Sequence, residues 1–265
     1  MRKIINISFW VFLIAGLFVM LGFVSKKQDA MLCKSLAINI KNSNGNFFIN
    51  QDDIKKIIHS KGDSIVHQPF STINIFGLEN SLDNNAYIED AQVYSTVNGD
   101  VKINVKQRQP LVRLFDKDGE SFYIDVTGKL MPLSDEYTSR VLVVNGNLQE
   151  SYAKYYNDNL NDIIKDSTLN KQTLLGSIYI IAKYINSDSL LKAQFQQMFV
   201  NQDSDFVLIP RVGMNKIILG DTTDLAMKFN KLKIFYREGL NTTGWWNKYA
   251  IINLKYKDQI VCTKK

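Results

Sequence analysis

The sequence is poor in the residues on which enzymes and metal sites depend. Its 265 residues include 2 histidines, His59 and His67, and neither has a second His or Cys at the spacing of a metal ligand. No G-x-S-x-G segment surrounds a serine, and no Gly-rich loop lies between an expected strand and an expected helix. We therefore expect no catalytic residue, no metal, no cofactor and no small-molecule substrate.

Charge of one sign is not concentrated anywhere in the chain. The 32 Lys and Arg residues exceed the 26 Asp and Glu residues, for a net charge of +6, but they form no basic run and no Arg-rich helix. Nucleic acid is therefore not an expected partner, because a surface that follows a phosphate backbone gathers its cations. The modest positive balance fits a surface near anionic lipid headgroups.

Cysteine is also scarce. The 2 cysteines, Cys33 and Cys262, are too few for a disulfide framework. Since they lie far apart in the sequence, a bond between them would require the two ends of the chain beyond residue 30 to meet. We favour two unpaired thiols and leave the disulfide as an open alternative.

One long apolar run lies at the N-terminus. Residues 4–24 hold no charged side chain, and about 20 apolar residues are enough to cross a bilayer. The run is long for a signal peptide, and no convincing pair of small residues marks a cleavage site. Charged residues separate Cys33 from it, which disfavours a lipoprotein. We expect a cytoplasmic tail at 1–3, an uncleaved transmembrane helix at 4–24 and a linker at 25–35.

The segment after the linker contains two expected helices. Asn50 can cap the first, which carries acidic residues in its first turn. The second would begin after Ser71 or Thr72 and would place Phe76 in its apolar stripe together with Leu78. Both are short amphipathic helices.

Strands flank these two helices. Alternating residues at 36–41 predict one strand, and two more flank Asn98-Gly99, a dipeptide typical of tight β-hairpins. The resulting order is strand, helix, helix, strand, strand. We expect residues 36–109 to form a small α+β domain, with Pro110 marking the boundary.

Residues 110–265 are richer in expected strands. Asp221 or Thr222 can cap the last helix of this region, and Gly239 can end it. These elements predict a mostly antiparallel sheet backed by helices, so the fold class is α+β. Strands are expected at 110–116, 121–126, 129–134, 140–146, 194–201, 205–210 and 215–220, and helices at 170–186 and 221–239.

The chain closes on an alternating segment. From Ile252 to Lys257, the side chains of Ile252, Leu254 and Tyr256 would face one way and the intervening polar side chains the other. Only eight residues follow Lys257, so we expect no later element to cover the outer edge of this strand. Ile260, Val261 and Cys262 suggest that the strand continues. Such an edge is either covered by an earlier element or kept for a partner.

Several segments, in this order, resemble the bacterial cell division family FtsQ, also called DivIB. After the apolar run and the strand-helix-helix-strand-strand unit come "KQRQP", "YIDVTGKLMPLS" and "VLVVNG". "IILG" then precedes the "KFNKLKIFY" helix, and "YAIINLKY" closes the series. Each segment is weak by itself, and the order carries the resemblance.

The resemblance implies a non-enzymatic divisome protein with a single membrane span. A POTRA domain would occupy 36–109 and a β domain 110–265, both on the periplasmic side of the inner membrane at the division septum. Its partners would be FtsB-like (DivIC-like) and FtsL-like proteins. Tyr256 matches the family's partner-contacting tyrosine on the last strand, Lys257 and Asp258 lie beside it, and Ile252 and Leu254 share the strand. Two other classes stay open: another anchored POTRA adaptor for protein assembly or translocation, and an anchored cell-wall enzyme.

Overall fold

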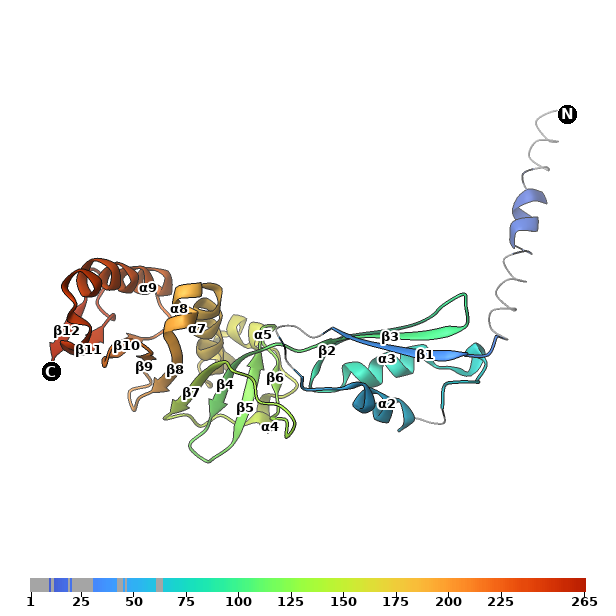
Figure 1. Ribbon diagram of the computed structural model, residues 1–265, viewed down its shortest axis with the longest axis horizontal. Helices are drawn as coiled ribbons and strands as arrows, with labels where there is room; N and C mark the ends of the chain where they lie inside the picture. The colour runs from blue at the N-terminus through green and yellow to red at the C-terminus, as the bar shows by residue number, and fades with distance from the viewer. Residues whose placement is uncertain are drawn as a thin grey trace. The chain divides into compact units, whose positions relative to one another are not determined.

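The computed structural model describes residues 10, 12–18, 20, 31–41, 45, 47–60 and 64–265. The chain divides into two compact units, a first unit that ends at Gln107 and a second unit that begins at Arg108 (Figure 1). The expected tail at 1–3, most of the expected span at 4–24 and most of the linker lie outside the described residues. Within the described part of the chain, no helix is both long enough and apolar enough to span a bilayer.

The first unit is a three-stranded sheet with two helices, and the predicted element order is confirmed. The strands lie in the order β1-β3-β2, with β1 parallel to β3 and β2 antiparallel to it. Gly99 has a φ of +97°, which explains why the hairpin turn uses the Asn98-Gly99 dipeptide. The elements are β1 (Ser35–Lys41), α2 (Gln51–His59), the 3₁₀ turn η1 (Phe70–Thr72), α3 (Ile75–Asp83), β2 (Ile88–Ser95) and β3 (Asp100–Gln107).

The two helices of the first unit begin at different kinds of cap. The side chain of Asn50 accepts from the N–H groups of Asp52 and Asp53, and Asp53 accepts from the N–H of Asn50, which is a capping box. The predicted start of α3 is wrong: the chain first forms η1, and Asn74 accepts from the N–H of Gly77 as the cap. Phe76 is 72% exposed and is not part of the apolar stripe.

The second unit contains a nine-stranded sheet in the order β12-β11-β10-β9-β8-β7-β4-β5-β6. Three neighbouring pairs, β4–β7, β7–β8 and β10–β11, are parallel and the others are antiparallel, so the expected mostly antiparallel sheet is confirmed. The strands are β4 (Pro110–Phe115), β5 (Ser121–Asp125), β6 (Leu130–Met131), β7 (Leu142–Gly146), β8 (Phe195–Val200), β9 (Phe206–Pro210), β10 (Lys216–Gly220), β11 (Tyr249–Asn253) and β12 (Val261–Lys264).

Helices pack along this sheet, and α7, α8 and α9 stack along one side of it (Figure 1). Three short helices between β7 and α7 were not predicted, because none is long enough to show a helical period. The helices are α4 (Tyr152–Tyr155), α5 (Leu160–Lys165), α6 (Ser167–Asn170), α7 (Leu175–Ser187), α8 (Ser189–Gln194) and α9 (Leu225–Ile234), followed by the π-helix η2 (Phe235–Asn241) and the 3₁₀ turn η3 (Trp245–Asn247).

The helix α9 contacts the end of the sheet formed by β11 and β12. Phe229 and Leu232 are fully buried in the core of the second unit, and the ring of Phe229 stacks on that of Tyr184 with centroids 5.0 Å apart. The expected stop at Gly239 is wrong, because the chain continues past Ile234 as the π-helix η2 and runs through Gly239. The buried face of α9 therefore holds Lys231 at a fixed position near the segment that follows β11.

Candidate strand-pairing edge

The C-terminal segment is a hairpin and not a single strand. β11 ends at Asn253, and the chain returns as β12, which pairs antiparallel with it through Ile252–Cys262 and Asn253–Val261. The expectation that one strand continues through Lys257 into the tail is wrong. The expectation that nothing later covers this strand is wrong as well, because β12 occupies the outer edge of β11.

Polar contacts of the turn after Asn253 explain why the strand stops there. The side-chain oxygen of Asn253 accepts from the N–H of Lys255 at 3.0 Å. The Nζ of Lys231, on α9, donates to the carbonyls of Leu254 at 3.5 Å and Lys257 at 3.0 Å, and also to that of Tyr256. The alternation of apolar residues does not predict these contacts. They end the strand although the alternation continues.

Lys255 anchors the same turn to the neighbouring strands. Its Nζ pairs with the carboxylate of Asp205 at 2.7 Å. Its stem lies over Gly220, where an added Cβ would stand 2.8 Å from the Cγ of Lys255, and Gly220 has a φ of +79°. A side chain at position 220 would therefore displace Lys255 and strain the backbone.

β12 presents an open edge. The N–H of Lys265 donates to the carbonyl of Lys248 across the hairpin at 3.2 Å. Because successive residues of a strand alternate in direction, the N–H and C=O groups of Lys264 and Cys262 point away from β11. Within the described residues, no group bonds to these outward positions. The sheet therefore ends in backbone groups that can pair with another strand.

The five residues singled out from the sequence fall into two sets. Ile252 and Leu254 have 0% exposure and face the core together, so their side chains hold the hairpin and have no surface to offer a partner. Tyr256 is 49% exposed and lies in the turn, not on a strand, with exposed Lys257 and Asp258 after it. Only the second set lies at the surface beside β12.

Other exposed residues near this edge were not predicted as site residues. Val261 on β12 is 41% exposed, and Trp245 is 45% exposed with the ammonium of Lys248 lying 3.0 Å from its ring centroid. Nothing in the local pattern marks Lys231, because its contacts lie more than twenty residues further along the chain.

The edge is cationic, and its one cysteine is partly buried. Lys248, Lys257 and Lys264 make no ion pair with a carboxylate of the described residues, and Asp258 is the single acidic residue after residue 244. Cys262 is partly buried on β12, and this burial raises the pKa of its thiol. Both cysteines are free thiols in the structure.

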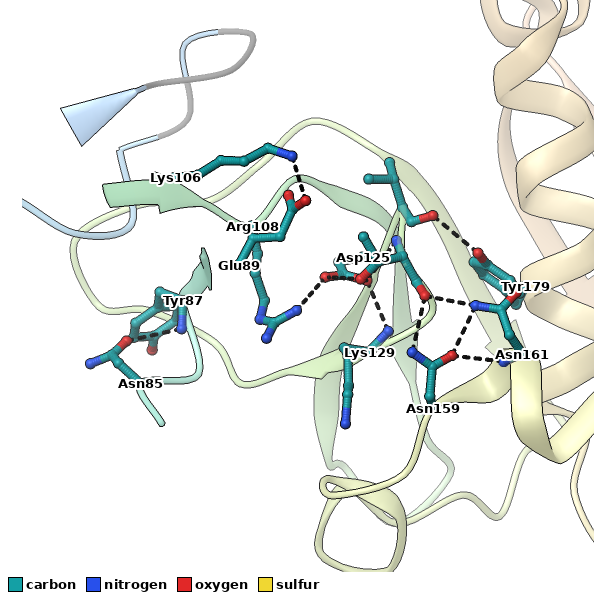
Figure 2. Close-up of polar contacts among 12 residues, drawn as sticks. Asn85, Tyr87, Glu89, Lys106, Arg108, Asp125, Lys129, Asn159, Asn161 and Tyr179 are labelled. Carbon is teal, nitrogen blue, oxygen red and sulfur yellow. Dashed lines mark hydrogen bonds and ion pairs between the residues drawn. The ribbon is translucent and has the colours of Figure 1, made fainter. Parts of the chain in front are cut away.

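A second polar cluster surrounds the Asp125 turn, at the opposite end of the sheet. The buried carboxylate of Asp125 accepts from Arg108 Nη1 at 3.0 Å and from the N–H groups of Thr127 and Lys129, both at 2.8 Å. Asn161 donates to the carbonyl of Thr127 at 2.8 Å, as Figure 2 shows.

This cluster has a structural role. The hydroxyl of Tyr179, on α7, donates to the carbonyl of Val126 at 3.0 Å, so the turn is tied to both α5 and α7 (Figure 2). Its carboxylate is satisfied by protein donors and has no open side for a ligand. No group of three or more His, Cys, Asp or Glu side chains that could hold a metal ion occurs in the part of the chain that the structure describes.

Comparisons with known proteins match both units. Residues 31–106 match a family model of POTRA-like domains. Residues 109–263, more than half of the chain, match the model described as FtsQ/DivIB, C-terminal related. No curated protein matches the chain in sequence. The second match includes both the Asp125 cluster and the β11–β12 hairpin.

Proposed function

We propose that this protein, which belongs to the FtsQ/DivIB family through its residues 109–263, is a membrane-anchored scaffold of the cell division machinery that receives a partner strand on β12. The family is in general one of non-catalytic division scaffolds. The partners would be FtsB-like (DivIC-like) and FtsL-like proteins, and the binding would link ring assembly to septal peptidoglycan synthesis.

The open edge of β12 is the observation that carries this proposal. An added strand gains affinity from main-chain hydrogen bonds whatever its side chains, and alternate side chains supply specificity. Because β12 covers β11, we assign the expected pairing role to β12 in place of β11. Val261 is exposed on that strand and can contact the side chain of a neighbouring strand.

The turn beside the edge supplies side-chain contacts. Tyr256 would be the anchor, because aromatic residues dominate the energetics of many interfaces. Lys257 and Asp258 would contact polar groups at its rim. Ile252 and Leu254 would act indirectly, by holding β11 in the core so that β12 has a firm neighbour.

The membrane attachment is part of the same proposal. The apolar run at 4–24 would cross the inner membrane once, with residues 1–3 in the cytoplasm. The POTRA-like unit would follow the linker, and both units would lie in the periplasm at the division septum. Protease added to spheroplasts should then digest the chain beyond about residue 34, whereas full protection would contradict this orientation.

The POTRA-like match favours one alternative. POTRA-like residues at 31–106 fit an anchored adaptor for protein assembly or translocation equally well. The two functions differ in the phenotype of depletion. A division scaffold should leave filamentous cells when it is depleted, and normal cell length on depletion would favour the adaptor.

The edge itself is tested with one position and two substitutions. Lys264→Pro removes an outward N–H of β12 without removing a bond to β11, while Lys264→Ala removes the same side chain and keeps the N–H. The proline variant should bind an FtsB-like fragment at least about tenfold more weakly than the alanine variant, which corresponds to about 1.4 kcal/mol. Equal binding by the two folded variants, measured by calorimetry, would place the partner elsewhere.

A further inference from the structure

Lys231 lies on α9 but makes its polar contacts with the turn between β11 and β12. Its neighbours on α9, Phe229 and Leu232, are fully buried, so the helix beneath it is fixed. Its ammonium, however, reaches the turn between β11 and β12, where it donates to the carbonyls of Leu254 and Lys257 and to that of Tyr256.

All the hydrogen bonds that the ammonium of Lys231 donates to described residues go to this turn. An ammonium has three N–H donors, and three backbone carbonyls converge on it. No carboxylate of the described residues forms an ion pair with Lys231. Without a cation the negative ends of three carbonyl dipoles would lie close together, so the turn as it stands needs this donor.

The outer strand of the hairpin has few buried side chains of its own. β12 has four residues, of which Val261, Thr263 and Lys264 are exposed, and only Cys262 and the preceding Ile260 pack against the core of the second unit. A short strand with so few buried side chains depends strongly on the turn that delivers it.

We infer that Lys231 is the positioning residue of the partner edge: it holds the turn so that β12 lies in register on β11 and Tyr256 is presented beside the open edge. Its effect on binding rests on the proposed function. Its effect on the order of the hairpin does not, and this separates the two in an experiment.

The experiment compares three variants of the full-length chain. Lys231→Met keeps an apolar stem of similar length and removes every donor, whereas Lys231→Arg restores a cation that can bond to carbonyls. Lys233→Met is the matched control, because Lys233 lies on the same helix and instead pairs with Asp188 at the start of α8.

Two measurements are made on each variant. Amide hydrogen exchange reports local opening of residues 255–264, and titration with the soluble region of an FtsB-like protein from the same organism reports binding. Lys231→Met should speed exchange in that segment by about tenfold or more, with the rest of the sheet unchanged, and should weaken binding by a similar factor. Lys231→Arg should recover most of both effects, and Lys233→Met should show neither.

Each alternative result has a definite meaning. Unchanged exchange in Lys231→Met would overturn the inference, whatever happens to binding. Faster exchange with parental binding, in a protein that Tyr256→Ala does weaken, would also overturn the positioning role and leave the proposed function intact. If the parent itself did not bind, the proposed function would fail, whereas faster exchange in Lys231→Met would still show that Lys231 holds the hairpin in order.

Discussion

The two sheets of this protein end in strands that are treated in opposite ways. In the first unit, the outward N–H groups of Ala91 and Val93 on β2 donate to the carboxylates of Asp83 and Glu79 on α3, at 2.8 and 2.7 Å. In the second unit, no such group from the described residues meets the outward N–H groups of β12.

The difference shows that the chain has a means of closing an edge. An exposed edge strand invites pairing with any other strand, and side chains that occupy its donors prevent this. The far edge of the second sheet is also protected, because Lys129 beside β6 forms a bridge with Asn159. Within the part of the chain that the structure describes, β12 thus lacks the carboxylate caps that close β2, and this difference supports a pairing role for β12.

Opening the closed edge should have the largest effect. Glu79→Ala together with Asp83→Ala removes both caps of β2 and leaves two N–H groups without a charged acceptor. Hydrogen bonds to charged groups contribute about 1.5–3 kcal/mol each, so the first unit should lose roughly 3 kcal/mol of unfolding free energy. Urea denaturation of the chain should show this loss, and sedimentation should show new self-association.

The control for this double variant lies on the same strand. Glu89 pairs with Lys106 on β3 and does not cap the edge. Because exposed ion pairs contribute little, Glu89→Ala should change stability by less than about 1 kcal/mol and should leave the protein monomeric. If the double variant behaved like Glu89→Ala, the carboxylates would not be edge caps.

Local patterns predicted features within single helices and turns better than they predicted the open edge. The capping residue Asn50, the hairpin at Gly99 and the buried face of α7 are short-range features, and a single sequence shows them. The end of β11 depends instead on Lys231 and Asp205, which lie far from the turn in sequence. Alternation alone could not reveal that these residues divide the last strand in two.

The caps of β2 show the same limit. Glu79 and Asp83 stand on the polar face of a short helix, where a solvated face is the ordinary interpretation. Their role appears only once β2 is known to pack beside α3. Phe76 was wrongly predicted to face the core for a similar reason, since the true helix start at Ile75 sets which side chains are buried.

A smaller effect should follow from truncating the exposed tyrosine beside the open edge. Tyr256→Ala removes an aromatic side chain that is 49% exposed and makes no core contact of its own. If it is an interface anchor, binding of an FtsB-like fragment should weaken by about 2 kcal/mol, or tens of fold, with unchanged stability. Calorimetric titration measures this directly.

An equally exposed tyrosine provides the matched control. Tyr156 is 51% exposed in the same unit and lies just after α4, outside the hairpin. Tyr156→Ala should bind like the parent. Equal weakening in both variants would mean that the loss reflects a general change in the unit and not a contact at the edge.

The smallest expected effect concerns the helix that supports the open edge. Lys228 on α9 is 5% exposed, and its ammonium donates to the carbonyl and the carboxylate of Asp221, at 3.0 and 2.8 Å. The hydrogen bond from Lys228, with further bonds from Thr223, lowers the pKa of Asp221 to about 2. Because the folded value lies below the ordinary 3.8, the ionised carboxylate stabilises the fold above pH 4, and this contribution is lost as the pH falls through 2. The carboxylate is 68% exposed, so solvent screening should keep the contribution below about 1 kcal/mol.

Asp221→Asn should therefore be slightly less stable than the parent at pH 5, and the two urea midpoints should converge as the pH approaches 2. The first unit lacks this pair, so its own unfolding should not differ between the two proteins at any pH. A gap between the midpoints that persisted unchanged down to pH 2 would show that the side chain acts through packing and not through its charge.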